Sequence, residues 1–146
     1  MRQVKLNPER CVMCDSCVIA CALGHSESQD INEYVLGGER AVPRLRIKAK
    51  NKKAQIVRCR HCKKPLCIEV CESGAVYKKE GYVVIDRTRC DGCGRCVDAC
   101  PYRALFREES SPVPVKCDLC AGSEPACIAA CLTGALYMSE DEDEGD

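Results

Sequence analysis

Residues 90–101 read Cys90-Asp91-Gly92-Cys93-Gly94-Arg95-Cys96-Val97-Asp98-Ala99-Cys100-Pro101. Three cysteines recur at steps of three residues, and a fourth follows four residues later, directly before a proline. The steps of three place three thiolates around one [4Fe–4S] cluster, whereas the last cysteine points away toward a second cluster. This stretch therefore predicts that the chain contains a partner run of cysteines.

The remaining cysteines form three more runs of the same kind. Each run opens with Cys-x-x-Cys and closes with Cys-x-x-x-Cys, and the gap between these pairs is two residues in the first and third runs, four in the second and six in the fourth. The sixteen thiols match four [4Fe–4S] clusters with no ligand left over. The first, second and fourth runs are Cys11, Cys14, Cys17 and Cys21; Cys59, Cys62, Cys67 and Cys71; and Cys117, Cys120, Cys127 and Cys131.

Three other uses of many cysteines fit this pattern less well. A secreted disulfide scaffold comes with a signal peptide, and its cysteines do not recur in steps of three. A zinc-binding structural module uses two separated Cys-x-x-Cys pairs per metal, and the spacing from Cys90 to Cys96 is too tight for that. A thioredoxin-type redox protein needs one Cys-x-x-Cys motif on a βαβ unit, whereas every one of the four runs here opens with such a motif. Zinc is the alternative that remains open.

The composition favours a small cytoplasmic protein that depends on its metal groups. The chain of 146 residues has no tryptophan and one phenylalanine, so aromatic packing contributes little to the core. Four bound clusters would cross-link the chain and stabilise its fold, so we expect the metal-free chain to be largely unfolded. The apolar stretch 16–24 is far shorter than the roughly 20 residues that cross a bilayer, which predicts no membrane insertion. The start of the chain has no apolar signal core, and so many thiolates favour a reducing cytoplasm.

The formal net charge of zero is the sum of two opposed blocks. Eleven lysines and arginines and no acid lie between Arg40 and Lys64, whereas residues 140–146 hold six acids and no base. From Leu45 to Ala49, apolar and basic residues alternate with the spacing of a β-strand. The basic block therefore predicts a hairpin with a cationic outer face. We interpret it as a docking face for an acidic partner or as compensation of cluster charge. Nucleic-acid binding is not expected, because stacking aromatic residues are absent there.

The chain resembles the four-cluster ferredoxin-type electron-transfer subunits that serve molybdenum and tungsten oxidoreductases, formate- and hydrogenase-linked complexes, and carbon monoxide dehydrogenases. The resemblance rests on the four runs in this order, the wide gap from Cys62 to Cys67, and the start Lys116-Cys117-Asp118-Leu119-Cys120 of the fourth run. It spans residues 4–138. It implies an α+β fold of two intertwined bacterial-ferredoxin-like units of βαβ type, one inserted in the other, with short strands and helices around four clusters.

The same resemblance implies boundaries and ligand sets. The outer unit would comprise residues 1–41 plus 107–139, the inner unit residues 59–106, the basic β-hairpin residues 42–58, and a disordered acidic tail residues 140–146. Each run would lend its last cysteine to the cluster of its partner run. The implied sets are Cys11, Cys14, Cys17 and Cys131; Cys117, Cys120, Cys127 and Cys21; Cys59, Cys62, Cys67 and Cys100; and Cys90, Cys93, Cys96 and Cys71.

The chain departs from the family where proline usually follows the last cysteine, since only Pro101 keeps it. Proline there is not a ligand, so the predicted ligand sets are unaffected. The short spacing from Cys100 to Cys117 resembles the compact subunits of tungsten aldehyde oxidoreductases, of related acyl-CoA reductases and of carbon monoxide dehydrogenase. The implied partner is such a larger catalytic subunit, with further redox subunits or copies of the chain itself as additional candidates.

The implied function is transfer of single electrons between a catalytic oxidoreductase subunit and another redox partner. No nucleophile or acid–base pair stands outside the cysteine runs, so we expect no catalysis by this chain alone. A free diffusible ferredoxin is the alternative of a different kind. His25 and His61 are interpreted as surface or hydrogen-bonding residues, since all sixteen ligand positions are filled by cysteine. The cations Arg58, Arg60, Lys63 and Lys64, with His61, predict a comparatively high potential for the cluster of the second run.

Overall fold

The computed structural model describes residues 2–140, a small α+β fold of short strands and helices as the sequence predicts. Of the predicted acidic tail, residues 141–146 lie outside the described part. The strands are β1 (Gln3–Leu6), β2 (Leu45–Lys50), β3 (Lys53–Arg58), β4 (Val76–Lys79), β5 (Tyr82–Ile85), β6 (Leu105–Phe106), β7 (Val115–Lys116) and β8 (Leu136–Ser139). The helices are α1 (Ser16–Gly24), α2 (Ile31–Leu36), α3 (Leu66–Glu69), α4 (Arg95–Ala99) and α5 (Ala126–Ala129), with a 3-10 turn η1 at Leu119–Gly122.

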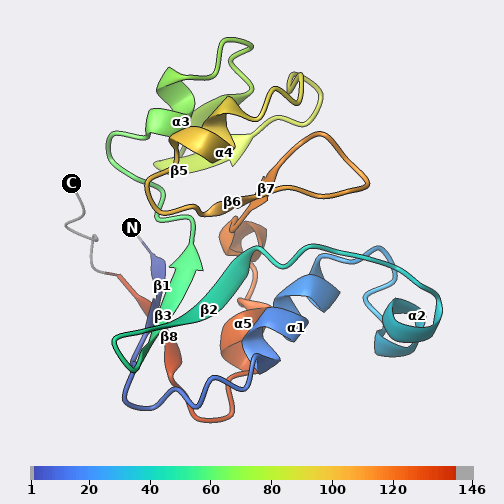
Figure 1. The fold of residues 1–146 in the computed structure, drawn as a ribbon, viewed down its shortest axis with the longest axis vertical. Helices are drawn as coiled ribbons and strands as arrows, with labels where there is room; N and C mark the ends of the chain where they lie inside the picture. The colour runs from blue at the N-terminus through green and yellow to red at the C-terminus, as the bar shows by residue number, and fades with distance from the viewer. Residues whose placement is uncertain (1, 141–146) are drawn as a thin grey trace.

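The described strands pair as four separate antiparallel sheets of two strands each (Figure 1). Two of them are hairpins, β2 with β3 and β4 with β5. The third joins the consecutive strands β6 and β7 across residues 107–114, and the fourth pairs β1 with β8, more than a hundred residues later in the chain. Because a two-stranded sheet is only marginally stable by itself, these sheets depend on what they pack against.

The β2–β3 hairpin follows from its alternating sequence and its turn. Leu45 is buried, whereas Arg46, Lys48 and Lys50 are exposed, so the cationic side chains lie on the outer face. Asn51 and Lys52 form the two-residue turn with φ angles of 52° and 60°. Positive φ at both central residues is typical of the turn whose twist matches that of the strands.

Each closing Cys-x-x-x-Cys pair spans about one turn of a short helix. Cys17 and Cys21 lie on α1, while α3, α4 and α5 carry one cysteine each and end just before the second. Helix α1 packs against α5, and α3 packs against α4. Figure 1 shows α3, α4 and β5 at one end of the molecule, α1, α5, β1 and β8 at the other, and β6 and β7 between them.

Two apolar clusters form the core, and both contain cysteines. The larger contains Val4, Leu45 and Leu136, and the smaller contains Val76 and Val83. Buried cysteines from all four runs complete these clusters. The apolar side chains therefore pack around the thiols instead of forming a separate core.

The weak apolar periodicity of residues 22–41 predicts a loop, but the structure forms helix α2 within this segment. Asp30 caps this helix, because its carboxylate accepts hydrogen bonds from the backbone N–H groups of Asn32 at 2.8 Å and Glu33 at 3.1 Å. Aspartate three residues before glutamate is a recognised helix-start signal, but the weak apolar periodicity hides it. None of the residues of α2 is buried, and Figure 1 shows the helix set apart from the body.

Pro112 and Pro114 predict an extended linker into Cys117, and the structure differs from this in part. Its last residues form β7, which pairs Val115 with Phe106 and Lys116 with Leu105. Within residues 2–140, no helix is both long enough and apolar enough to cross a membrane.

Candidate iron–sulfur cluster sites

All sixteen cysteines are free thiols. Cys14 and Cys93 are exposed, and the others are partly or fully buried. Four buried or half-buried thiols, those of Cys17, Cys127, Cys67 and Cys96, have their pKa raised by thiols of their own run and of one other run, and we call each such set a thiol group. The helix pairs explain this arrangement, because α1 packs against α5 and α3 against α4.

The first group surrounds a small cavity at the start of α1. The cavity is lined by the cysteines Cys11, Cys14, Cys17 and Cys131 together with apolar side chains that include Leu6, Ile47 and Leu136. The pKa of the Cys17 thiol is raised to about 11. Burial is the main cause, and the nearby thiols of Cys131 and Cys11 contribute to the rise. The cavity thus brings three thiols of the first run to the last thiol of the fourth.

The second group combines the fourth run with the last cysteine of the first. Burial raises the pKa of the Cys127 thiol to about 12, with further contributions from the thiols of Cys117, Cys21 and Cys120. Cys127 lies on α5 and Cys21 on α1, so the packing of these helices brings the two sulfurs together.

The third group combines the second run with the last cysteine of the third run. The pKa of the Cys67 thiol is raised to about 12. Burial is the main cause, and the thiols of Cys59, Cys100 and Cys62 contribute to the rise. The contact between α3, which carries Cys67, and α4, which ends at Cys100, produces this group.

The fourth group combines the third run with the last cysteine of the second run. Burial is the main cause of the raised pKa of the Cys96 thiol, and the thiols of Cys90, Cys71 and Cys93 add to it. Cys93 is exposed, as Cys14 is in the first group. One group at each end of the molecule therefore reaches the surface.

These donor sets fit a polynuclear iron–sulfur group. Burial penalises the thiolate form, as the raised pKa values show, so thiolates here require a positive partner such as iron. Among the described residues, no three His, Cys, Asp or Glu side chains lie close enough together for one metal ion. A cubane is held by four thiolates spaced around a larger volume than that of a single zinc ion, which lies about 2.3 Å from each sulfur.

A left-handed residue recurs at one position of every run. The residue directly before the second cysteine has positive φ in each case, at 53° for Met13, 51° for His61, 75° for Gly92 and 55° for Leu119. This conformation turns the Cys-x-x-Cys segment so that both sulfurs can face one centre. Only the third run places glycine there, so the other three runs hold strained backbone that cluster binding would offset.

The thiol of the last cysteine in each run accepts a hydrogen bond from a backbone N–H group. Cys71, Cys100 and Cys131 accept from residues four or five positions later, namely Val76 at 3.4 Å, Ala104 at 3.5 Å and Leu136 at 3.4 Å. Such bonds stabilise a thiolate and influence the potential of a bound cluster. Cys21 instead accepts from Arg44, 23 residues later, at 3.3 Å. The start of β2 therefore supplies to Cys21 the N–H group that nearby residues supply in the other runs.

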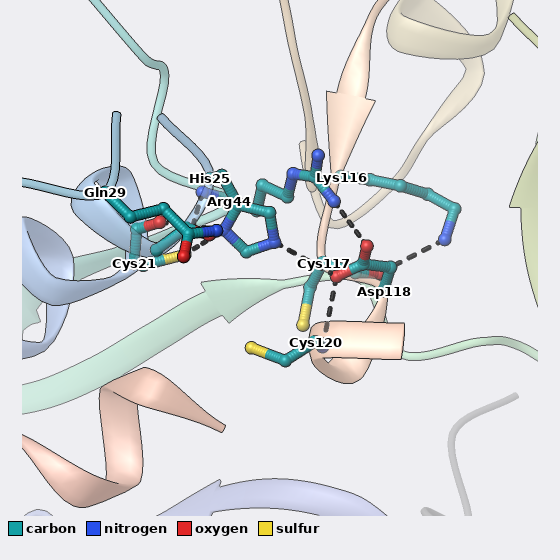
Figure 2. Close-up of polar contacts among 9 residues, drawn as sticks. Cys21, His25, Gln29, Arg44, Lys116, Cys117, Asp118 and Cys120 are labelled. Atoms are coloured by element: carbon teal, nitrogen blue, oxygen red, sulfur yellow. Dashed lines mark hydrogen bonds and ion pairs between the residues drawn. The ribbon is translucent and has the colours of Figure 1, made fainter. Parts of the chain in front are cut away.

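A polar network surrounds Cys21 (Figure 2). His25 Nδ1 lies 2.8 Å from the carbonyl oxygen of Cys21, and His25 Nε2 lies 3.3 Å from a carboxylate oxygen of Asp118. Arg44 forms an ion pair with the other oxygen of Asp118. Burial alone would raise the pKa of Asp118, but the hydrogen bond from His25 and the charge of Arg44 hold it well below its usual range. The network joins the first and fourth runs through charged side chains.

Two residues of the second run are more buried than the sequence suggests. His61 is 1% exposed, and its Nδ1 accepts the N–H of Val83 at 3.1 Å, so it is a hydrogen-bonding residue and not a surface one. Burial, aided by the charges of Lys116 and Arg58, lowers the pKa of His61 to about 3, which makes it neutral at pH 7. Arg58 is 4% exposed and bonds to Val4, so it does not belong to the exposed cationic face. Because its ring is neutral, His61 is not one of the cations that the sequence predicts beside the second run.

Comparison with known families identifies the cysteine runs. Residues 53–141 match the family model described as a 4Fe-4S dicluster domain, and these residues contain the second, third and fourth runs. Residues 8–24 match a model described as a 4Fe-4S binding domain, and these residues contain the first run.

Similar proteins are named as electron carriers. The putative electron transport protein YsaA of Escherichia coli (strain K12) is 34% identical over 137 residues, covering 91% of this chain and 86% of that protein. The electron transport protein HydN of the same strain is 37% identical, and the match covers 92% of this chain and 86% of HydN. The thiosulfate reductase electron transfer subunit PhsB of Salmonella typhi is 35% identical, covering 93% and 74%.

Among solved structures, a chain of the active site complex BamBC of benzoyl coenzyme A reductase, as isolated, superposes with a TM-score of 0.53. The two are 22% identical, and the match covers 100% of this chain and 81% of that chain. At this identity, the likeness shows a shared fold.

Proposed function

Because the chain belongs to the family described by the 4Fe-4S dicluster domain, we propose that it binds four [4Fe–4S] clusters and conducts single electrons between a catalytic oxidoreductase subunit and a second redox partner. Its relatives are named as electron transport proteins or electron transfer subunits, so the chain is an electron-transfer component and not a catalyst on its own. The observation that carries the proposal is that Cys17, Cys127, Cys67 and Cys96 each have neighbouring thiols from their own run and from one partner run.

The ligand sets in this proposal follow the four groups. Each set takes three thiols from one run and the last thiol from its partner run, which the mutual influence of the thiols within each group supports. The proposed ligands are Cys11, Cys14, Cys17 and Cys131; Cys117, Cys120, Cys127 and Cys21; Cys59, Cys62, Cys67 and Cys100; and Cys90, Cys93, Cys96 and Cys71.

We further propose two intertwined ferredoxin-like units. The pairing of β1 with β8 and the packing of α1 on α5 support an outer unit built from both ends of the chain. The β4–β5 hairpin and the packing of α3 on α4 support an inner unit. The boundaries are those the resemblance implies, residues 1–41 with 107–139 and residues 59–106, joined by the basic hairpin of residues 42–58.

The thiols also suggest a linear order of the four sites. Cys17 of the first group influences Cys127 of the second, and Cys59 of the third group influences Cys117 of the second. Helices α3 and α4 are shared by the third and fourth groups. The order is therefore first, second, third, fourth, with the exposed Cys14 and Cys93 in the terminal groups. Electrons would enter at one terminal site and leave at the other.

In this function the clusters supply the one-electron chemistry, and the protein's residues position and tune them. The cysteine thiolates fix each site, and the N–H groups of Arg44, Val76, Ala104 and Leu136 stabilise negative charge on sulfur. The apolar side chains lining the first cavity exclude water from one face of the thiols.

The partner in this proposal is a larger catalytic reductase or oxidoreductase. PhsB is named as a subunit of thiosulfate reductase, and another relative, 33% identical, is named as a subunit of tetrathionate reductase. The short segment between Cys100 and Cys117 favours the tungsten or molybdenum aldehyde oxidoreductase type or carbon monoxide dehydrogenase. The exposed lysines of β2 suit an acidic face of that partner. Sixteen free thiols favour a cytoplasmic, reducing location.

Anaerobic affinity purification of the tagged chain from its native host, followed by elemental analysis, tests the proposal. We expect about sixteen iron atoms per chain, because four cubanes contain that number, and a co-purifying large subunit that contains tungsten, molybdenum or nickel. Iron at that level without a companion protein would favour a free diffusible ferredoxin. Zinc in place of iron would exclude electron transfer altogether.

A further inference from the structure

Lys116 is a buried lysine at the point where the two central thiol groups meet. It lies on β7 directly before Cys117, is 5% exposed, and donates a hydrogen bond from Nζ to the carbonyl oxygen of Cys117 at 3.1 Å. No ion pair joins its ammonium group to a carboxylate among the described residues. A buried ammonium group is costly unless a negative charge compensates it. The compensating charge must come from another source.

The groups that face this lysine are thiols that we propose as cluster ligands. Its positive charge acts on Cys67 of the third group, opposing the rise that burial causes in the pKa of that thiol. On the other side lies Cys117 of the second group, where the charge of Arg58 opposes burial in the same way. Both cations therefore lie within electrostatic reach of the two central groups.

Arg58 is fixed at this junction by its hydrogen bonds. Nε donates to the carbonyl oxygen of Val4 at 2.5 Å, and Nη1 donates to Gln3 Oε1 at 2.7 Å and to the carbonyl oxygen of Cys59 at 2.6 Å. These bonds hold the guanidinium group next to the second run whatever the state of the thiols. Asp118, the nearby carboxylate, is already held by Arg44 and His25.

His61 adds an unused donor at the same place. Its Nδ1 accepts the N–H of Val83, so the proton of the neutral ring is on Nε2. Nε2 is buried and has no hydrogen-bond partner among the described residues. A sulfur of a bound cluster is the acceptor that this environment lacks.

We propose that Lys116, with Arg58, compensates the negative charge of the two central clusters and raises their reduction potentials above those of the two terminal clusters. This inference rests on the proposed function, because it requires four bound clusters. Reduction adds a negative charge, and a nearby buried cation favours the reduced form. Exposed cations such as Arg60 and Lys63 act more weakly, because water and salt screen them. An electron would therefore rest on the central pair before it moves to a terminal site.

The test is a redox titration of the full-length, cluster-loaded chain, followed by electron paramagnetic resonance under anaerobic conditions. Lys116→Gln removes the charge and keeps a donor for the Cys117 carbonyl. We expect the equilibrium constant for reduction of two clusters to fall at least tenfold, about 59 mV for a one-electron couple, and that of the other two to stay unchanged. Lys116→Arg keeps the charge and should restore both potentials.

Lys79→Gln is the matched control, because it removes the same charge from an exposed position on β4. It should move no potential by a comparable amount. If Lys116→Gln loads less iron, Lys116→Met and the charge-retaining Lys116→Arg provide the same comparison. Unchanged potentials, or an equal shift of all four, would overturn this inference while four clusters in the parent chain would leave the proposed function intact. A parent chain without four clusters would refute the proposed function first.

Discussion

Asp118 links residues that lie 74 and 93 positions away in the chain. Its carboxylate pairs with Arg44 and accepts from His25, and its Oδ1 also accepts the backbone N–H of Cys120 at 3.1 Å. The Nε of Arg44 is buried without a partner among the described residues. This single carboxylate therefore fixes the approach of the first run and β2 to the fourth run.

Replacing Asp118 by asparagine tests that role. The variant keeps an oxygen for Cys120 but leaves Arg44 without its ion pair, so we expect a loss of roughly 1–3 kcal/mol of stability. The measurement is the midpoint of thermal bleaching of the cluster-loaded chain. Glu9→Gln is the control, since the pair of Glu9 with Lys53 is exposed to solvent and should contribute little to stability. Equal midpoints for Asp118→Asn and the parent would contradict the role.

Gly92 is required by backbone conformation and by close approach. Its φ is +75°, and an added Cβ would lie 2.6 Å from the Cβ of Pro112. Gly92→Ala should therefore impair iron binding by the third run, with strain of about 1–2 kcal/mol from the left-handed backbone alone and a further cost from the clash. Gly38→Ala is the control, because Gly38 has φ of +72° with open space around it. Iron per chain, measured after identical reconstitution, should fall only for Gly92→Ala.

The elements of this protein are short, and local features determine where each one begins and ends. Pro65 and Pro125 precede α3 and α5, while α1 and α4 each follow a left-handed residue, Asp15 or Gly94. Within the described chain no strand is longer than six residues. Elements this short cannot be stable alone, so their stability depends on packing around the thiols.

The turn of the β2–β3 hairpin offers a test at this scale. Lys52 has φ of 60°, which glycine adopts without strain. Lys52→Gly should stabilise the hairpin by about 0.5–1 kcal/mol, seen as slower amide hydrogen exchange in β2 and β3. Exchange in the β4–β5 hairpin serves as the internal control and should not change. Faster amide exchange in β2 and β3 would contradict the left-handed conformation of Lys52 in this turn.

For the whole molecule, the proposed clusters replace the missing core. The two apolar clusters contain buried cysteines from every run, and several large apolar side chains, including Leu36 and Leu132, are exposed. The cysteines are therefore part of the apolar core itself. Without metal, the raised thiol pKa values leave neutral sulfhydryl groups that no longer hold two runs together.

Removal of iron should consequently unfold the chain. We expect anaerobic chelation to abolish most of the far-ultraviolet circular dichroism, together with the visible absorbance, because metal binding and folding are coupled. Reconstitution with iron and sulfide should restore both signals. Addition of zinc alone is the control and should restore neither. A metal-free chain that kept its full circular dichroism would show that the apolar clusters suffice.

Sequence and tertiary structure determined different properties of this protein. The cysteine spacings predicted iron–sulfur ligation, because ligand spacing acts within a few positions. The family resemblance that these spacings carry implied the α+β class with short helices and strands. The helix α2 was missed, since its capping aspartate precedes a weakly periodic segment. Folding decided which helices pack side by side, that the backbone N–H of Arg44 reaches Cys21, and that Lys116, Arg58 and His61 are buried. These contacts join residues tens of positions apart, and burial depends on the packing of whole elements, which no local pattern encodes.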